Sequence, residues 1–255
     1  IGKETWESVD FSQIPEGAEV LPIIVIYTKK DNGVYKARAV VLGNQQESNP
    51  DLATYSPVIS HTTLRMLLHH ASLKNLHFSN FDISAAFVNA PIGSEVYCRL
   101  PDQLLEKGES PYVKLKRALY GLRQAPRLWS RHFSQNLKRI GFTQSEYDPG
   151  LYYAQGKYGV VYAAIYVDDG VILGDQRDAE MFREKILNVF SGRKEPLEVK
   201  GDIERLTYVG LEIVRDRKRR KIWLQQNTLI DKIEQRFKEF LGDDNEDYQD
   251  VGKRT

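Results

Sequence analysis

Two adjacent acids stand between two apolar segments, and this arrangement constrains the fold more than any other feature of the sequence. Residues 158–167 (YGVVYAAIYV) and 170–175 (GVILGD) both have the composition of buried strands. Asp168 and Asp169 fill the space between them, which is long enough only for a tight turn. Asp and the following Gly170 are common turn residues, so a plain Asp-rich β-turn is one interpretation.

Two adjacent carboxylates in a partly buried turn repel each other, so that either one binds a proton or a cation neutralises the pair. Oxygen ligands alone favour a hard cation such as Mg²⁺. Asp82, in the segment 80–87 (NFDISAAF), is a candidate third ligand because it ends a short expected strand. A helix N-cap is the alternative for Asp82. Three carboxylates from two strand ends would suit two ions about 3.5–4 Å apart, which promote in-line displacement at phosphorus.

Composition limits the class of protein. The chain has 255 residues, 41% of them hydrophobic, so we expect a globular fold with a sizeable core. The apolar runs, such as residues 23–27, are far shorter than the roughly 20 residues of a membrane span. Cys98 is the single cysteine, which excludes a disulfide framework and a cysteine zinc site. His69 and His70 point to different faces of an expected helix, so we do not expect them to bind a metal.

Charge is distributed unevenly along the chain. The net charge of +1 gives little information about nucleic-acid binding, but residues 239–250 carry six acids and no base. Bases cluster in the segments 114–131 and 215–221. Such clusters can contact phosphates, whereas solvated faces and an exposed hairpin tip are the alternative, and charge alone does not decide between them.

The spacing of apolar residues predicts both strands and helices. Residues 19–30 and 34–43 predict a hairpin across the turn DNG, and residues 204–216 and 221–226 predict a second hairpin with RKRR at its tip. Helical spacing is present at 61–74, 125–142, 177–190 and 228–241, a short strand is expected at 77–84, and the tail from 242 onward is expected to be loose. Together these elements predict an α+β chain with helices on one side.

Several longer motifs narrow the interpretation. YVDD, preceded by FDISAAF, resembles the catalytic signature of reverse transcriptases, and the surrounding segments resemble the copia-type (Pseudoviridae-like) branch of the LTR retrotransposons. The motifs follow the order of that family from about residue 5 to residue 237. They are TWESV, YKARAVVLGNQ, YSPVIS, FDISAAFVNAPIGSEVYCRLP, VKLKRALYGLRQAPRLW, YVDDGVILG, LTYVGLEI and LQQNTLIDKI.

The resemblance implies the fold of a right-hand polymerase, with an antiparallel palm sheet backed by helices and a truncated thumb. It assigns residues 1–80 to the fingers and residues 81–200 to the palm, with about 92–120 belonging to the fingers. Residues 201–226 become the primer-grip hairpin, 227–241 the start of a thumb-like helix, and 242–255 an acidic, loose tail.

The resemblance also implies roles for individual residues. Asp82, Asp168 and Asp169 would bind two Mg²⁺ ions, or Mn²⁺ in their place. Phe87 matches the bulky residue that lies under the incoming sugar and excludes a 2′-hydroxyl, and a core phenylalanine is the alternative for it.

Further residues match the nucleotide and primer contacts of the family. Lys29, Lys36 and Arg38 match bases that hold the triphosphate, with Lys30 as the alternative to Lys29. Tyr120, Gly121 and Gln124 match a segment under the nucleotide, for which a simple loop before a helix is the alternative. Tyr208, Val209 and Gly210 match the primer grip, and Lys200 matches a general acid that protonates pyrophosphate.

Some segments depart from the family pattern. Ala90 stands where relatives commonly have Gly, and the link 191–205 is longer than usual. The resemblance implies a complete thumb, a connection and an RNase H domain beyond these 255 residues. It therefore leaves open whether this chain is active alone.

The resemblance predicts an RNA-directed DNA polymerase with two-metal nucleotidyl transfer to a primer 3′-hydroxyl. A domesticated or relic fold that serves as a nucleic-acid-binding or assembly module without polymerase activity is the alternative. Expected partners are an RNA or DNA template with its primer, deoxynucleoside triphosphates and other parts of a larger polyprotein, but no membrane. The expected location is intracellular, either in a cytoplasmic virus-like particle or in the nucleus.

Overall fold

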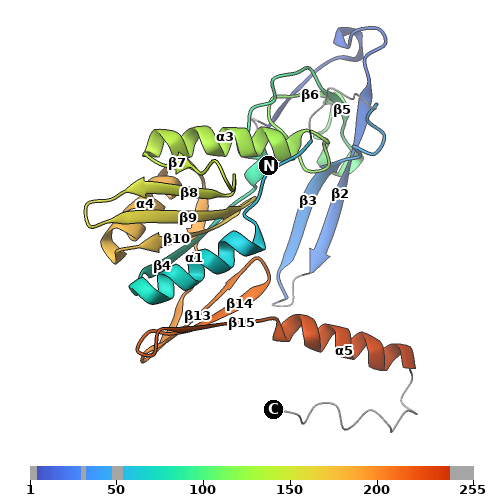
Figure 1. Ribbon diagram of the computed structural model, residues 1–255. Coiled ribbons are helices and arrows are strands. Elements are labelled where there is room, and N and C mark those ends of the chain that lie inside the picture. The colour runs from blue at the N-terminus through green and yellow to red at the C-terminus, as the bar shows by residue number, and fades with distance from the viewer. Residues whose placement is uncertain (1–4, 30–32, 48–53, 242–255) are drawn as a thin grey trace. The chain divides into compact units, whose positions relative to one another are not determined.

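The chain divides into two compact units, which we describe separately. The computed structural model describes residues 5–29, 33–47 and 54–241. The first unit comprises residues 1–67 and 76–195, and the second comprises residues 68–75 and 196–255. Figure 1 labels the main helices and strands of both units.

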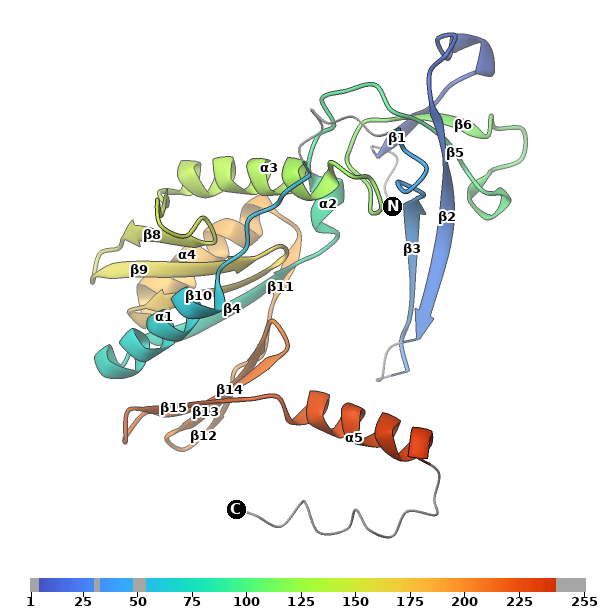
Figure 2. The same ribbon diagram turned by 45° about the vertical axis from the view of Figure 1, so that its right-hand side comes forward.

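The first unit contains a five-stranded sheet of order β1-β6-β5-β2-β3. Its strands are β1 (Trp6–Ser8), β2 (Val20–Lys29), β3 (Tyr35–Val41), β5 (Tyr97–Arg99) and β6 (Tyr112–Leu115), and the 3-10 turns Phe11–Gln13 and Asp102–Leu104 lie between them in the chain. Only the first three residues of β2 pair with β5. The rest of β2 pairs with β3 alone, so the β2–β3 hairpin projects from the rest of this sheet (Figure 2).

A six-stranded antiparallel sheet of order β11-β4-β10-β9-β8-β7 forms the rest of the first unit. Its strands are β4 (His77–Ile83), β7 (Thr143–Gln144), β8 (Leu151–Gln155), β9 (Val160–Tyr166), β10 (Asp169–Gly174) and β11 (Gly192–Lys194). The accompanying helices are α1 (His61–Lys74), α2 (Ala86–Asn89), α3 (Ala125–Ile140) and α4 (Gln176–Val189). In Figure 1, α4 lies behind this sheet and the start of α1 lies in front of it.

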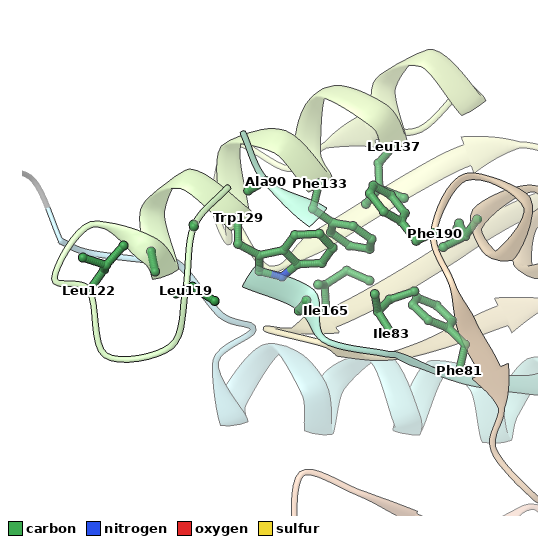
Figure 3. Close-up of a cluster of buried hydrophobic side chains, with 14 of the residues drawn as sticks. Phe81, Ile83, Ala90, Leu119, Leu122, Trp129, Phe133, Leu137, Ile165 and Phe190 are labelled. Atoms are coloured by element: carbon green, nitrogen blue, oxygen red, sulfur yellow. The ribbon is translucent and has the colours of Figure 1, made fainter. Parts of the chain in front are cut away.

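The main core lies between this sheet and the helices α3 and α4 (Figure 3). Trp129 and Phe133 project from α3 at the spacing of one helical turn, and their ring centroids lie 5.0 Å apart. Phe190, at the end of α4, meets the Trp129 ring edge-on at 5.2 Å. Phe81 and Ile83 of β4 belong to the same core, so this face of the sheet is covered by aromatic and aliphatic side chains.

The second unit is a four-stranded sheet followed by a helix. The strands, in the order β12-β13-β14-β15, are β12 (Glu198–Lys200), β13 (Ile203–Tyr208), β14 (Leu211–Asp216) and β15 (Lys221–Gln225), and the helix is α5 (Asn227–Leu241). Arg215 is fully buried, and its Nη1 lies 3.4 Å from Glu204 Oε2 on the neighbouring strand. Arg215 Nη2 donates a 2.7 Å hydrogen bond to Asn75 Oδ1, which ties the residue that follows α1 to this sheet.

The four predicted helices and the predicted hairpin of residues 19–43 are present. The second predicted hairpin is present with its basic tip at residues 217–220. Its first arm, predicted as one strand over residues 204–216, is wrong, because Val209 and Gly210 form a turn that divides it into β13 and β14. The short strands β1, β5, β6, β7, β8, β11 and β12 were not predicted. The expected placement of the helices on one side is wrong, because α4 and the start of α1 lie on opposite faces of the six-stranded sheet. Strands β4 and β10 have buried side chains on both faces, so both faces need to be covered. The expected loose tail, residues 242–255, lies outside the described residues.

Among the described residues, no helix is long and apolar enough to cross a membrane. Cys98 is buried, and this burial raises the pKa of its thiol to about 12.

The buried Arg215 generates a stability prediction. We expect Arg215→Ala to lower the free energy of unfolding of the second unit by about 3–5 kcal/mol, because it removes the fully buried partner of the Glu204 carboxylate and leaves that carboxylate paired only with the more exposed Arg217. Arg205→Ala is the control, since Arg205 forms an exposed pair with Glu212 on the same sheet and its loss should cost no more than about 1 kcal/mol. Denaturant unfolding measures both, and equal losses would contradict the assignment.

Candidate active site

The three acids predicted from the sequence lie at the ends of adjacent strands. β4 and β10 pair in a register that sets Asp82 directly opposite Asp169. Asp168 precedes β10, and its carbonyl accepts a 2.9 Å hydrogen bond from the backbone N–H of Ile83. The strand pairing therefore brings the three acids to one end of the six-stranded sheet.

Asp82 and Asp169 share the face of the sheet that lies away from α3 and α4. Side chains alternate between the two faces along a strand. Phe81 and Ile83, on either side of Asp82, are both buried in the core with those helices. Ile172 belongs to the same core and lies three residues after Asp169, so Asp169 points to the other face.

Trp129, a core residue, forms a hydrogen bond to the turn that carries Asp168. Because Tyr166 pairs with Asp169, only Val167 and Asp168 form the turn. Val167 has a φ of 55°, a conformation that a β-branched residue rarely adopts and that costs on the order of 1–3 kcal/mol. Trp129 Nε1 donates a 2.7 Å hydrogen bond to the Val167 carbonyl, and this contact fixes the turn against the core.

Gly170 follows the acid pair because an aromatic ring occupies the place of its side chain. Gly170 and Phe81 are partners in the β10–β4 pairing. A Cβ at Gly170 would lie 2.1–2.8 Å from three carbons of the Phe81 ring, far inside van der Waals contact. Any other residue at position 170 would displace this ring.

The acids are crowded enough to change their protonation. The pKa of Asp169 is raised to about 6, first by burial and then by the neighbouring charges of Asp168 and Asp82. Burial also raises the pKa of Asp82, although Arg193 opposes this effect. Both shifts indicate that the negative charges are unfavourable together without a compensating cation.

Arg193 supplies a cation to this cluster, and sequence reasoning missed it. β11 pairs with β4 so that Arg193 stands opposite Asp82, and its Nη2 lies 3.2 Å from Asp82 Oδ2. Its Nε lies 2.7 Å from Glu195 Oε1. The spacing of Arg193 and Glu195, two residues apart, was the available signal, but it falls at the end of a three-residue strand that the sequence pattern did not predict.

The carboxylates of Asp82, Asp168 and Asp169 have the chemistry to bind a divalent ion, but their side chains do not converge on one point. Carboxylate oxygens from Asp82, Asp168 and Asp169 are hard ligands of the kind that Mg²⁺ prefers. Within the described part of the chain, no three His, Cys, Asp or Glu side chains converge closely enough to hold an ion.

Two predicted nucleotide-site aromatics contact each other near these acids. The rings of Phe87 and Tyr120 meet edge-on with centroids 4.8 Å apart. Burial raises the pKa of the Tyr120 hydroxyl, and the charge of Asp168 raises it further. Phe87 also packs against the core, so one side chain fits both of the interpretations that the sequence left open.

The structure brings together two of the predicted triphosphate-binding bases but not the third. Ile26 pairs with Arg38 and Thr28 pairs with Lys36, so Lys36 and Arg38 share one face of the β2–β3 hairpin. Lys29 lies on the other face of this hairpin, because it is adjacent to Thr28 along β2. The positive charge of Lys36 opposes the rise in the pKa of Asp82, and that of Arg38 opposes the rise in the pKa of Tyr120.

Lys30, the predicted alternative to Lys29, lies outside the described residues.

The segment around Gly121 packs tightly on β3. The carbonyl of Tyr120 accepts a 2.8 Å hydrogen bond from the N–H of Val41. Gly121 has a φ of 89°, and a Cβ there would lie 1.9 Å from the Val41 carbonyl oxygen, so this close contact between backbones requires glycine. Gln124 is buried, and its Oε1 accepts a 3.0 Å hydrogen bond from Gln46 Nε2.

The departure at Ala90 has a simple structural explanation. Ala90 is fully buried, and its φ of −86° is accessible to any residue, so glycine is not required there. Its carbonyl accepts a hydrogen bond from the N–H of Ala118 at 2.9 Å.

The predicted primer-grip residues and Lys200 belong to the second unit. Val209 and Gly210 form the two-residue turn between β13 and β14, and both have a positive φ. Tyr208 precedes this turn and is buried, whereas Lys200 is exposed at the end of β12.

Comparisons with known proteins identify relatives over nearly the whole chain. The chain is 36% identical over 182 residues to the Retrovirus-related Pol polyprotein from transposon RE1 of Arabidopsis thaliana, which covers 69% of this chain and 12% of the relative. It is 29% identical over 233 residues to the corresponding polyprotein from transposon TNT 1-94 of Nicotiana tabacum, which covers 88% of this chain and 17% of the relative. The chain therefore spans less than a fifth of the length of these curated relatives.

A solved structure shares the fold at low sequence identity. A structure of telomerase from Candida albicans superimposes with a TM-score of 0.50 and 9% identity, and the match covers 88% of this chain and 48% of that chain. This likeness supports the mixed α/β fold with several sheets and nothing more specific.

A family model matches nearly the whole chain. The family model described as Reverse transcriptase (RNA-dependent DNA polymerase) matches residues 3–248. Together with the transposon relatives, this match confirms the predicted copia-type resemblance. The chain belongs to the reverse transcriptase (RNA-dependent DNA polymerase) family, in its retrotransposon branch.

Proposed function

We propose that this chain catalyses RNA-directed DNA synthesis, in which deoxynucleotides are added to the 3′-hydroxyl of a primer on an RNA template. The observation that carries the proposal is the strand register that sets Asp82 opposite Asp169, with Asp168 in the adjoining turn. Family membership supports the same reaction.

Asp82, Asp168 and Asp169 would hold two divalent ions, with Mg²⁺ as the preferred metal. Such ions supply activation of the attacking hydroxyl and stabilisation of the leaving pyrophosphate. The raised pKa values of Asp82 and Asp169 support this assignment, because a cation would relieve the repulsion that contributes to both. The hydrogen bond from Trp129 to the Val167 carbonyl would keep the ligands of the turn in position.

The right-hand layout assigns the six-stranded sheet to the palm and the five-stranded sheet to the fingers. Because β5 and β6 pair with β2 and β1, residues 92–120 fit the fingers although they follow the first palm strand in sequence. The hairpin 201–226 would be the primer grip and 227–241 the start of the thumb. Lys200 stays a candidate for the general acid.

On the side of the acids, Lys36 and Arg38 would bind the triphosphate of the incoming nucleotide. Their shared face of the hairpin and their effect on the pKa values of Asp82 and Tyr120 support this role. Phe87, supported edge-on by Tyr120, would occupy the space that a 2′-hydroxyl needs.

The acid pair generates a direct test of activity. We expect the double variant Asp168→Asn, Asp169→Asn to lower primer extension on an RNA template by on the order of 10³-fold or more, because metal charge stabilisation contributes several kcal/mol to such reactions. The assay measures incorporation of deoxynucleotides with Mg²⁺. Asp175→Asn is the control, since Asp175 caps α4 through its side chain and Asn caps equally well.

Equal incorporation by the double variant and the unchanged protein would refute the polymerase assignment. Tight binding of RNA or DNA by the unchanged protein, without incorporation at saturating Mg²⁺, would favour the binding or assembly module instead.

Phe87 generates a test of sugar selectivity. We expect Phe87→Val to reduce the preference for deoxynucleotides over ribonucleotides by about tenfold or more, because the smaller side chain leaves room for the 2′-hydroxyl; tenfold corresponds to about 1.4 kcal/mol. The ratio of kcat/KM for the two nucleotides measures this preference. Tyr120→Phe keeps the ring that contacts Phe87 and should leave the ratio nearly unchanged, and a purely structural Phe87 would alter stability but not the ratio.

A further inference from the structure

We propose that Arg193 is an internal counter-cation of the candidate metal site, which binds Asp82 in the metal-free protein and moves fully onto Glu195 when a divalent ion binds. The inference rests on the proposed metal site and adds a residue that neither the motifs nor the family match assigns. Arg193 would act through Asp82, so it is a positioning residue rather than a catalytic one.

Strand pairing delivers the guanidinium to Asp82. Arg193 stands opposite Asp82 in the β11–β4 pairing, so both side chains lie on the face of the sheet away from α3 and α4. The Nη2 to Oδ2 distance of 3.2 Å is that of an ion pair. The backbone on both sides of Arg193 is anchored, because Ser84 N–H donates to the Ser191 carbonyl and Glu195 N–H donates to the Asn80 carbonyl.

The Arg193 side chain is exposed, whereas its strand is held by pairing with β4. Arg193 is 62% exposed and Asp82 is 23% exposed, so the guanidinium does not fill a cavity in a core. An ion pair of this exposure is weak enough to exchange. A divalent ion brings twice the charge of a guanidinium to the same carboxylate, so it would displace Arg193 from Asp82.

Glu195 provides the second position. Arg193 Nε already lies 2.7 Å from Glu195 Oε1 while Nη2 contacts Asp82. A guanidinium has five N–H donors, so the contact with Glu195 can persist, and strengthen, when the contact with Asp82 breaks. The movement therefore needs one ion pair to open and no change in the backbone.

The exchange has a functional consequence. Without metal, Arg193 compensates Asp82 within a cluster that also contains Asp168, Asp169 and Glu195. With metal, the guanidinium on Glu195 would neutralise the carboxylate that otherwise adds to the negative potential at Asp82 and Asp169. The cost is a lower apparent metal affinity, because an ion must compete with Arg193 for Asp82.

The test measures Mn²⁺ binding by calorimetry in the full chain without nucleic acid or nucleotide. We expect Arg193→Gln to bind Mn²⁺ about fivefold more tightly, which is the size expected for release from one partly exposed ion pair. Lys194→Gln is the matched control: it removes the same charge from the next residue of β11, on the other face of the strand, and should change the affinity less than about twofold. General damage to the strand would weaken binding rather than tighten it.

Unchanged or weaker binding by Arg193→Gln, or equal tightening by Lys194→Gln, would overturn the counter-cation role. Arg193→Lys keeps the charge but not the fork of donors, and we expect its affinity to lie between those of the Gln variant and the unchanged protein. If the Asp168→Asn, Asp169→Asn variant binds Mn²⁺ as tightly as the unchanged protein, both the metal site and the role of Arg193 fail. If that variant loses binding and Arg193→Gln has no effect, only the counter-cation role fails.

Discussion

The antiparallel pairing of β4 with β10 is the interaction on which the candidate site depends. The pairing joins two segments almost ninety residues apart in the chain and sets Asp82 opposite Asp169. Neither segment alone would gather the three acids, since the β9–β10 hairpin brings Asp168 and Asp169 and β4 brings only Asp82. The paired strands are buried on both faces, so hydrophobic burial rather than the acids themselves provides the energy that holds the charges close together.

That energy has to overcome a repulsion, and the surroundings of the acids reduce it. Arg193 contacts one carboxylate, and the pKa of Asp169 is raised to about 6, which makes protonation accessible close to neutral pH. The surroundings also maintain the strained φ of Val167, which valine does not prefer. The hydrogen bond from the buried Trp129 to the Val167 carbonyl holds the turn in this conformation. A cluster of this kind is costly to fold, and this cost supports the metal site proposed above.

Much of the site could be predicted from the sequence because its elements have strong local signals. The apolar runs beside Asp168 predicted a hairpin, and the spacing of Trp129 and Phe133 predicted α3. The motifs around Asp82 indicated the family before any geometry was known. In contrast, Arg193 lies in a short edge strand and Glu195 directly follows it. The pairing of this strand depends on tertiary contacts, so no local pattern identified either residue. The division of Lys29 from Lys36 depends on the register of a hairpin, which cannot be read reliably from composition.

The contact between Gly170 and Phe81 also protects the chain from a folding error. A slip of one residue between β10 and β4 would direct the acids toward the apolar core, and it would place a residue with a side chain where the Phe81 ring now lies. Both consequences penalise the wrong alignment, the first through buried charge and the second through steric overlap. Gly170, the smallest residue in the motif, thus favours the correct register of β10 and β4. In this register Asp82 and Asp169 lie on the face of the sheet away from the apolar core.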